Sequence, residues 1–316
     1  MASGGYTHGL HEVGDGLYAY LQPDGGWGWS NAGLVSDGEH SLLIDTLFDL
    51  QLTERMLAEM RRAVLGTARI ETVLNTHANG DHCYGNQLVA DARILASQRA
   101  FEEMSELPPA AMATLVEQAP NMGELGEFFL RCFGGFDFSP IELTLPSETF
   151  TGELTVGVGD REVRLIEVGP THTGGDTIAW LAAERVLFTG DVLFNGGHPI
   201  VWAGPVSNWI AACDLIVSLD PAVVVPGHGP LAGLAEVHEL RAYFSYLYER
   251  ARECHGEGMS ALEAARSLSL DRWAEWGERE RLVVNIACIY AEIEGREPPG
   301  ALEAFQQMAE LAAPGK

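Results

Sequence analysis

Residues 76–82 read THANGDH, which places three side chains that can bind a metal ion, His77, Asp81 and His82, within six positions. Gly80 and the residues after His82 favour a tight loop over a helix or a strand. Imidazole nitrogens together with a carboxylate oxygen suit zinc, iron or manganese. The stretch therefore predicts one part of a metal site, to be completed by residues from elsewhere in the chain.

Four loops share one pattern: each follows a short apolar strand and carries a His or an Asp with Gly close by. Residues 70–74 form the predicted strand before the THANGDH loop, and strand ends are where open α/β sheets generally place binding sites. The three later loops carry His172, Asp191 and His228. A single His in a Gly-rich turn is more often a hydrogen-bonded loop residue than a ligand, but four such loops in succession favour one shared site.

The spacing of apolar residues predicts an α/β protein. Residues 49–64 and 207–219 carry apolar side chains at helical spacing, with strand patterns before and between them. Residues 97–136 turn helical and amphipathic and break the strand-rich order around them, which indicates a helical insertion or lid. Residues 231–316 are nearly all helical by the same spacing, so we expect a helical C-terminal extension.

The composition is that of an ordinary soluble globular protein, with 316 residues of which 47 % are hydrophobic. The formal net charge of −26 argues against nucleic acid or a membrane as partner. Apolar runs are only strand-length, and residues 1–5 lack the features of a signal peptide, so a cytoplasmic location is expected. Five scattered Cys without a Cys-x-x-Cys pair indicate neither a disulfide framework nor cysteine-bound zinc.

Taken together, the four loops resemble the metal motifs of the metallo-β-lactamase-fold hydrolases, which include glyoxalase II-like thioesterases, lactonases and alkylsulfatases. The matching segments are THANGDH at 76–82, GPTHTGGD at 169–176, FTGD at 188–191 and PGHG at 226–229. They occur in the family's order and at roughly its separations. The resemblance implies a four-layer αββα sandwich for residues 1–230, with metal ions at one edge.

Carried over position by position, the resemblance implies two metal sites. The first would be formed by His77, Asn79 and His172, the second by Asp81, His82 and His228, and Asp191 would bridge the two. The family has a His where this chain has Asn79. An amide oxygen is a weaker zinc ligand than an imidazole, so the first site should bind its metal less tightly, whereas the second keeps four protein ligands.

These sites predict a metal-dependent hydrolase of a small organic substrate. A metal with an open position lowers the pKa of its bound water to roughly 7, and the hydroxide can attack an ester, thioester, lactone or related bond. One or two zinc ions are the expected cofactors, with iron or manganese also compatible. If only the second site is occupied, His77 and His172 could act as general base or hold an oxyanion, and they and Asp81 are the predicted catalytic residues.

Two other functions are compatible with the same residues. His77, His172 and Asp191 provide two imidazoles and one carboxylate, the ligand set of non-haem iron enzymes that use oxygen. A binding module without metal is the second alternative, and it is disfavoured because only one of seven ligand positions departs from the family pattern. Zinc content with ester hydrolysis, or iron content with oxygen uptake, would separate the first alternative from the hydrolase.

Aromatic residues near the predicted loops suggest a pocket for an apolar part of the substrate. The candidate lining residues are Trp27, Trp29, Asn195, His198 and Trp202. His198, on a Gly-rich loop, could contact substrate or replace the imidazole missing at Asn79, but a surface position is the expectation. The 97–136 insertion is expected to contribute a further wall.

Two residues close to the predicted ligands are expected to have structural roles. Asp45 ends a strand and is predicted to orient the metal loop without binding the metal. Cys83 follows His82 directly and is expected to be a small buried residue. The apolar stripes of the C-terminal helices are expected to pack on the sandwich, with a homodimer interface as the alternative.

Overall fold

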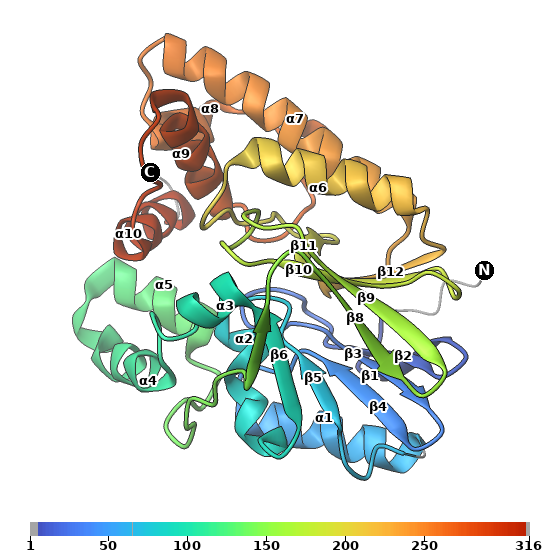
Figure 1. Cartoon of the computed structure of the whole chain (residues 1–316). Coiled ribbons are helices and arrows are strands. Elements are labelled where there is room, and N and C mark those ends of the chain that lie inside the picture. Colours follow the sequence, from blue (N-terminus) through green and yellow to red (C-terminus); the bar gives the residue numbers. More distant parts are fainter. Residues whose placement is uncertain (1–5, 65, 314–316) are drawn as a thin grey trace.

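The computed structural model describes residues 6–64 and 66–313. Two β-sheets pack face to face at the centre of the molecule, and helices cover the outer face of each sheet (Figure 1). This arrangement confirms the predicted αββα sandwich with added helices. Predictions about residues 1–5 lie outside the described part of the chain.

The first sheet has seven strands in the order of the sequence. They are β1 (Gly9–Gly14), β2 (Leu17–Leu21), β3 (Ala32–Asp37), β4 (His40–Ile44), β5 (Thr72–Leu74), β6 (Arg93–Ser97) and β7 (Glu148–Phe150). Strands β1 to β4 are antiparallel, whereas β4 to β7 run parallel. The carboxyl ends of the parallel strands therefore meet at one edge of the sheet, directly before the THANGDH stretch.

The second sheet has five strands in the order β12-β11-β10-β9-β8. They are β8 (Glu153–Val158), β9 (Arg161–Glu167), β10 (Thr177–Leu181), β11 (Val186–Phe194) and β12 (Val223–His228). Only β11 and β12 run parallel, and both carry candidate ligands near their carboxyl ends. The two sheets thus bring four chain segments to the same edge.

The helices form the two outer layers and a lobe beside the sheets (Figure 1). They are α1 (Leu50–Ala63), α2 (Gly80–Cys83), α3 (Gln98–Glu103), α4 (Pro109–Gln118), α5 (Gly123–Phe133), α6 (Val206–Leu219), α7 (Leu234–Gly256), α8 (Ala261–Ser267), α9 (Arg281–Glu294) and α10 (Ala301–Ala312). Short 3₁₀ turns lie at η1 (Tyr84–Val89), η2 (Ala119–Asn121) and η3 (Asp271–Trp273).

A continuous hydrophobic layer joins the two sheets. Inward-facing side chains of both sheets are fully buried, among them Leu17, Leu42 and Val163. Gly33 of β3 leaves room for the ring of Phe188 from β11, since a Cβ on Gly33 would lie only 2.5 Å from two ring carbons. The close approach of the sheets at this point depends on the missing side chain.

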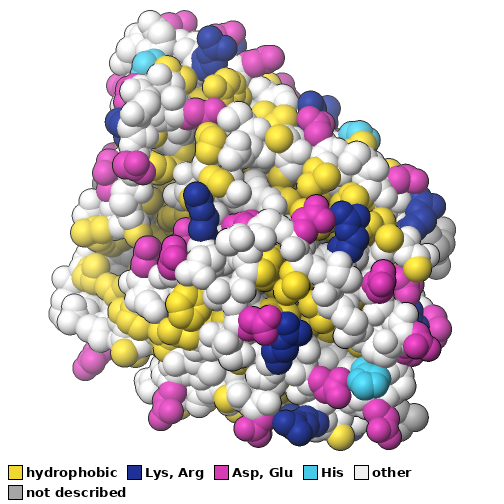
Figure 2. Space-filling view, viewed as in Figure 1, with side chains coloured by type: hydrophobic (Ala, Val, Ile, Leu, Met, Phe, Trp, Pro, Cys, Tyr) yellow, Lys and Arg dark blue, Asp and Glu magenta, His cyan; other side chains and the backbone are white. Residues whose placement is uncertain are grey.

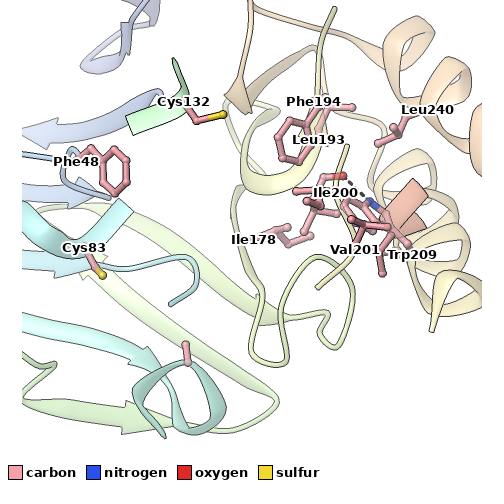
Figure 3. Close-up of a cluster of buried hydrophobic side chains, with 14 of the residues drawn as sticks. Phe48, Cys83, Cys132, Ile178, Leu193, Phe194, Ile200, Val201, Trp209 and Leu240 are labelled. Atoms are coloured by element: carbon pink, nitrogen blue, oxygen red, sulfur yellow. Dashed lines mark hydrogen bonds between the residues drawn. The ribbon is translucent and has the colours of Figure 1, made fainter. Parts of the chain in front are cut away.

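The outer helices are amphipathic and are fixed to the sheets by buried side chains. Helix α1 starts at Asp49, whose carboxylate accepts a hydrogen bond from the Leu52 backbone N–H at 2.8 Å. On the other side of the molecule, the indole N–H of Trp209 in α6 donates to the carbonyl oxygen of Val192 in β11 at 2.8 Å (Figure 3). Trp209 is fully buried and anchors α6 on the second sheet.

Two predictions of local structure need correction. Residues 80–86 form the short helix α2 and the start of η1 instead of a loop, because the His82 N–H donates to the Asn79 carbonyl oxygen at 3.0 Å and begins a helical turn. Asp191 lies within β11 instead of in a loop after a strand. The strand pairing with β12 is irregular around Gly190, whose φ of +50° turns the backbone there.

The predicted insertion and extension are helical, and they contact each other. Residues 97–136 contain α3, α4 and α5, and residues after 230 form α7 to α10. Helix α10 packs against α5, so the two segments meet beside the ligand edge (Figure 1). The domain boundary at residue 230 stays a prediction.

The described cysteines are all buried and unpaired, which confirms their predicted role as small core residues. Among the described residues, no helix combines the length and hydropathy needed to cross a membrane. A cytoplasmic location and a homodimer stay predictions.

We expect Gly33→Ala to lower the free energy of unfolding by about 1–3 kcal/mol, because the added methyl group must push Phe188 out of place between the sheets. Chemical denaturation followed by circular dichroism measures the change. Gly157→Ala on β8 is the matched control, since nothing lies within 4 Å of its added Cβ. Equal midpoints for the two variants would contradict the tight contact.

Candidate metal centre

Four imidazoles converge on the carboxylate of Asp191. Its Oδ1 lies 3.0 Å from Nε2 of His82, and its Oδ2 lies 3.3 Å from Nε2 of His172, 3.4 Å from that of His228 and 3.8 Å from that of His77. All five side chains are buried. The Nε2 atoms of His77, His82 and His172 and the Oδ1 of Asp191 have no hydrogen-bond partner among the described residues. Buried donor atoms that face one another without hydrogen bonds fit a cation between them.

Asp45 orients two of these imidazoles through the end of β4. Its Oδ2 accepts a hydrogen bond from Nδ1 of His82 at 2.9 Å and another from the Thr76 hydroxyl at 2.8 Å. That hydroxyl in turn lies 3.0 Å from Nδ1 of His77 and can accept its proton. With Nδ1 protonated, each ring directs the lone pair of Nε2 to the centre. The predicted supporting position of Asp45 is confirmed.

Backbone carbonyls orient the other two imidazoles. Nδ1 of His172 lies 2.7 Å from the carbonyl oxygen of Ile200, and Nδ1 of His228 lies 3.1 Å from that of Gly25. Both contacts require a proton on Nδ1 and leave Nε2 free to bind a metal. In all four rings Nδ1 is thus the nitrogen held by a hydrogen bond, and Nε2 points toward Asp191.

The donor atoms form two overlapping groups. Ligand atoms of His77, His82 and Asp191 lie within 4.8 Å of one another, and so do those of Asp81, His82 and His228. Asp81 Oδ2 lies 3.3 Å from Nε2 of His228 and 3.9 Å from Nε2 of His82. The second group contains the three residues predicted for the second site, whereas the first joins His77 to His82 and Asp191; the division into two sites stays a prediction.

Charge and burial set the protonation of these groups. For Asp191, burial raises the pKa, but the surrounding imidazoles hold it well below its ordinary value. Burial lowers the pKa of His77 well below its ordinary value, with His82 adding to the effect. Burial also disfavours the charged form of His228, yet Asp191 and its neighbours raise the pKa of His228 to about 9. The carboxylates therefore favour a proton on Nε2 of His228 when no metal is present, and metal binding at this nitrogen would release that proton.

Asp176 holds the His172 loop in place, a role that the sequence reading missed. Its buried carboxylate accepts hydrogen bonds from the backbone N–H groups of Thr171 at 3.0 Å and Thr173 at 2.9 Å. These bonds flank His172 on both sides and fix the turn that carries it. The signal was present in the sequence, since Asp176 is the last residue of GPTHTGGD.

A cavity of about 630 Å³ opens directly over the metal centre. Its floor is lined by Asn79, Asp81, His172, Asp191 and His228. Its walls are mostly apolar, and Figure 2 shows hydrophobic side chains gathered around a hollow on the left of the molecule, where Figure 1 places α4, α5 and α10. Leu107 and Leu302 line the cavity and are 48 % and 63 % exposed, so they mark its mouth.

Helix α10 contributes Phe305, which closes an aromatic wall. Its ring centroid lies 5.7 Å from that of Trp27, 5.9 Å from that of Trp202 and 5.9 Å from that of Phe133. Trp27 and Trp202 were candidate pocket residues, and the structure places both on the cavity wall. Phe305 was not, because nothing in the sequence positions a C-terminal helix over a loop near residue 27.

A family model described as the metallo-beta-lactamase superfamily matches residues 25–228. The chain belongs to this superfamily. The matched range contains all seven residues of the candidate metal centre and ends before α7. The resemblance that the four motifs indicated is therefore confirmed at the level of the superfamily.

Individual relatives are distant. The chain is 24 % identical over 260 residues to a protein of Bos taurus described as acyl-coenzyme A thioesterase MBLAC2, covering 76 % of this chain and 86 % of that one. It is 23 % identical over 224 residues to a Caenorhabditis elegans protein described as a beta-lactamase-like protein 2 homolog, covering 71 % of this chain and 63 % of that one. The solved sec-alkylsulfatase Pisa1 from Pseudomonas sp. matches with a TM-score of 0.66 and 18 % identity over 90 % of this chain. This chain spans 50 % of the sulfatase chain, and the likeness shows the fold alone.

Asn79 marks the departure from the superfamily motif. It lies half-buried at the cavity floor, at the start of α2, and its side chain makes no capping hydrogen bond to that helix. Its assignment as a ligand of the first site stays a prediction. Its oxygen offers a neutral, weaker donor than the imidazole expected there.

Three other candidate pocket residues lie away from the cavity. Trp29 packs against Phe136, with centroids 5.1 Å apart, and borders a separate smaller cavity. Asn195 donates its amide hydrogens to backbone carbonyls of the turn after β12. His198 is fully buried, with Nδ1 3.1 Å from the Tyr243 hydroxyl, so the prediction of a surface position was wrong. The C-terminal helices cover its loop, and their placement was not readable from local sequence.

We expect Asp45→Asn to weaken metal affinity about 10–100-fold, because a neutral amide is a weaker acceptor than a carboxylate for the hydrogen bonds from His82 and Thr76. Asn tolerates the positive φ of 63° at this position, so the backbone should keep its course. Competition with a chromophoric chelator measures the affinity. Asp160→Asn, at an exposed turn, is the matched control, and equal affinities in both variants would contradict the role of Asp45.

Proposed function

We propose that the protein is a metal-dependent hydrolase that cleaves an ester, thioester, lactone or related bond of a small organic substrate. One observation carries the proposal: six metal-capable side chains converge at the floor of a largely apolar cavity. Membership of the metallo-β-lactamase superfamily supports it. The description of the bovine relative as a thioesterase favours an ester-like bond.

The donor set fits one or two zinc ions, with iron or manganese also compatible. Four imidazoles and two carboxylates are present, and three of the imidazole Nε2 atoms are buried without a partner. Asp81, His82, His228 and Asp191 would hold the ion of the second site. His77, His172 and Asp191, with the amide of Asn79, would offer a weaker first site.

When bound, the metal would lower the pKa of a coordinated water to roughly 7 and so supply hydroxide. The residues of the chain would prepare the attack. Asp81 has a side chain that is 13 % exposed and faces the cavity, so it can hold a proton from the attacking water or orient that water. If the first site is vacant, Nε2 of His77 or His172 can take the same proton or stabilise an oxyanion. The apolar walls keep bulk water away and strengthen these interactions.

Metal quantification on the purified protein, combined with hydrolysis of p-nitrophenyl esters and acyl thioesters, tests the proposal. We expect zinc or another divalent metal at one equivalent or more, loss of hydrolysis after chelation, and recovery when metal is added back. Purified protein that holds no metal and hydrolyses no ester would contradict the proposal. Iron content with oxygen uptake and no hydrolysis would favour the oxygen-dependent enzyme instead.

For Asp81→Asn we expect kcat/KM to fall by about 10²-fold or more, since the amide can neither bind the metal as a charged ligand nor accept the proton. Asp91→Asn, at an exposed position far from the motif, is the matched control and should keep full activity. Steady-state kinetics with a fixed metal concentration measure both. Unchanged kcat/KM in Asp81→Asn would show that this carboxylate has no role in catalysis.

Asn79→His tests the first site separately. We expect the metal content to rise from about one to two equivalents per chain, because an imidazole is a stronger zinc ligand than an amide. Elemental analysis after dialysis against a weak chelator counts the ions. If the wild-type protein already holds two tightly bound ions, the prediction of a weak first site is wrong.

A further inference from the structure

Arg281 is a buried cation on the wall of the cavity over the metal centre. It is the first residue of α9, is 2 % exposed, and is the one Lys or Arg among the described residues that line this cavity. It lies outside residues 25–228, the range shared with the superfamily model. A charged side chain is rarely buried to this extent without a partner of opposite charge.

The guanidinium group has one hydrogen bond to the residues that the structure describes. Nη1 donates to the carbonyl oxygen of His198 at 3.0 Å, while Nε is buried without a partner. The guanidinium carbon lies 4.1 Å from the ring centroid of Trp27 and 5.4 Å from that of Phe194. Among the described residues, no carboxylate forms an ion pair with it, that is, none has an oxygen within 4.0 Å of its nitrogens. Nε and Nη2 are therefore left without an acceptor in the part of the chain that the structure describes.

The acidic residues nearest in sequence, Glu278 and Glu280, do not line the cavity over the candidate metal centre. Glu278 and Glu280 line the separate smaller cavity, which Arg281 does not line, whereas Trp27 borders both cavities. Glu280 is engaged with the Trp27 indole N–H, which donates to its Oε1 at 3.0 Å. Burial raises the pKa of Glu278 and the charge of Arg281 partly offsets this rise, but neither glutamate has an oxygen within 4.0 Å of the guanidinium nitrogens.

Phe194 connects Arg281 to the metal centre. Its ring stacks on the ring of His228 with centroids 5.1 Å apart and an angle of 3° between the planes. The distance from the guanidinium carbon to the His228 ring can therefore be no larger than the sum of the two contacts that Phe194 makes. A short organic molecule can span from Arg281 to the atoms that face Asp191.

We propose that Arg281 binds an anionic group of the substrate, a carboxylate or sulfate, so that the preferred substrates are amphipathic anions. A guanidinium group forms charge-assisted hydrogen bonds with the oxygens of such a group, and Nη2 is the nitrogen of Arg281 that can donate to it. The apolar part of the substrate lies against the aromatic wall of Trp27, Trp202 and Phe305, and the bond to be cleaved reaches the metal centre. This inference rests on the proposed hydrolase function and names its substrate class.

Ligand binding to the metal-loaded protein tests the inference without turnover. The probes are octanoate, octyl sulfate and octanol, which share an eight-carbon chain, and binding is measured by calorimetry or by the fluorescence of the wall tryptophans. We expect one or both anions to bind at least ten times more tightly than octanol. Tight binding of only octanoate, or only octyl sulfate, identifies the anion that the site takes.

Variants at position 281 assign the anion to this residue. We expect Arg281→Gln and Arg281→Met to lose at least tenfold in anion affinity while octanol binding stays within about twofold. Arg281→Lys should keep part of the affinity, and Arg279→Met, at an exposed neighbour, should keep all of it. Circular dichroism checks that each variant folds, and Gln can replace the hydrogen bond to the His198 carbonyl. Equal binding of anions and octanol by the wild type, or full anion binding in Arg281→Gln, would overturn the inference, since the anion would then be held elsewhere or by the metal.

Turnover separates this inference from the proposed function. The substrates are the p-nitrophenyl esters of octanoic acid and of octanedioic acid, which differ only in a terminal carboxylate. We expect the wild type to prefer the carboxylate ester at least tenfold in kcat/KM and Arg281→Gln to lose that preference while hydrolysing the neutral ester normally. Hydrolysis of both esters without preference would overturn the role of Arg281 alone. No hydrolysis of either ester would overturn the proposed function. The role of Arg281 in anion binding would then be decided by the binding experiment alone.

Discussion

The approach of four imidazoles to one buried carboxylate is the constraint on which the rest of the structure depends. The Nε2 atoms concerned lie between 3.0 and 3.8 Å from the oxygens of Asp191. Buried polar atoms that lack hydrogen bonds destabilise a fold unless a cation or protons occupy the space between them. Each ring is also held at its far nitrogen, by Asp45, by Thr76 or by a backbone carbonyl. Much of the hydrogen bonding around the site therefore orients the four imidazoles, whose contacts with one another add little stability to the fold.

The sequence predicted the parts of the site that local motifs carry. His77, Asp81 and His82 share one turn, and each of the other candidate ligands is marked by Gly near a strand end, so short windows of sequence were enough. Positions that depend on the packing of remote segments were not readable. Phe305 and Arg281 reach the cavity only because helices α9 and α10 fold back over the ligand edge, and no periodicity in those helices indicates where they dock.

The same physical reason explains the residue that was misplaced. His198 lies in a Gly-rich loop, a context that favours exposure, but Tyr243 from α7 packs over it and excludes solvent. Its carbonyl oxygen then serves as the hydrogen-bond acceptor for Arg281. Residues after 230 therefore form part of the cavity wall, whereas the cavity floor is made of residues within the range 25–228.

The overall charge of the protein makes a local cation more important. At −26, the chain repels small anions at long range, but salt screens this repulsion beyond about 8 Å under physiological conditions. Within the cavity, Arg281 acts at short distance and in an environment of low polarity, where a charge-assisted pair is strong. An anion with an apolar body is thus favoured at the Arg281 end of the cavity, whereas a neutral apolar molecule gains only the contacts with the aromatic wall.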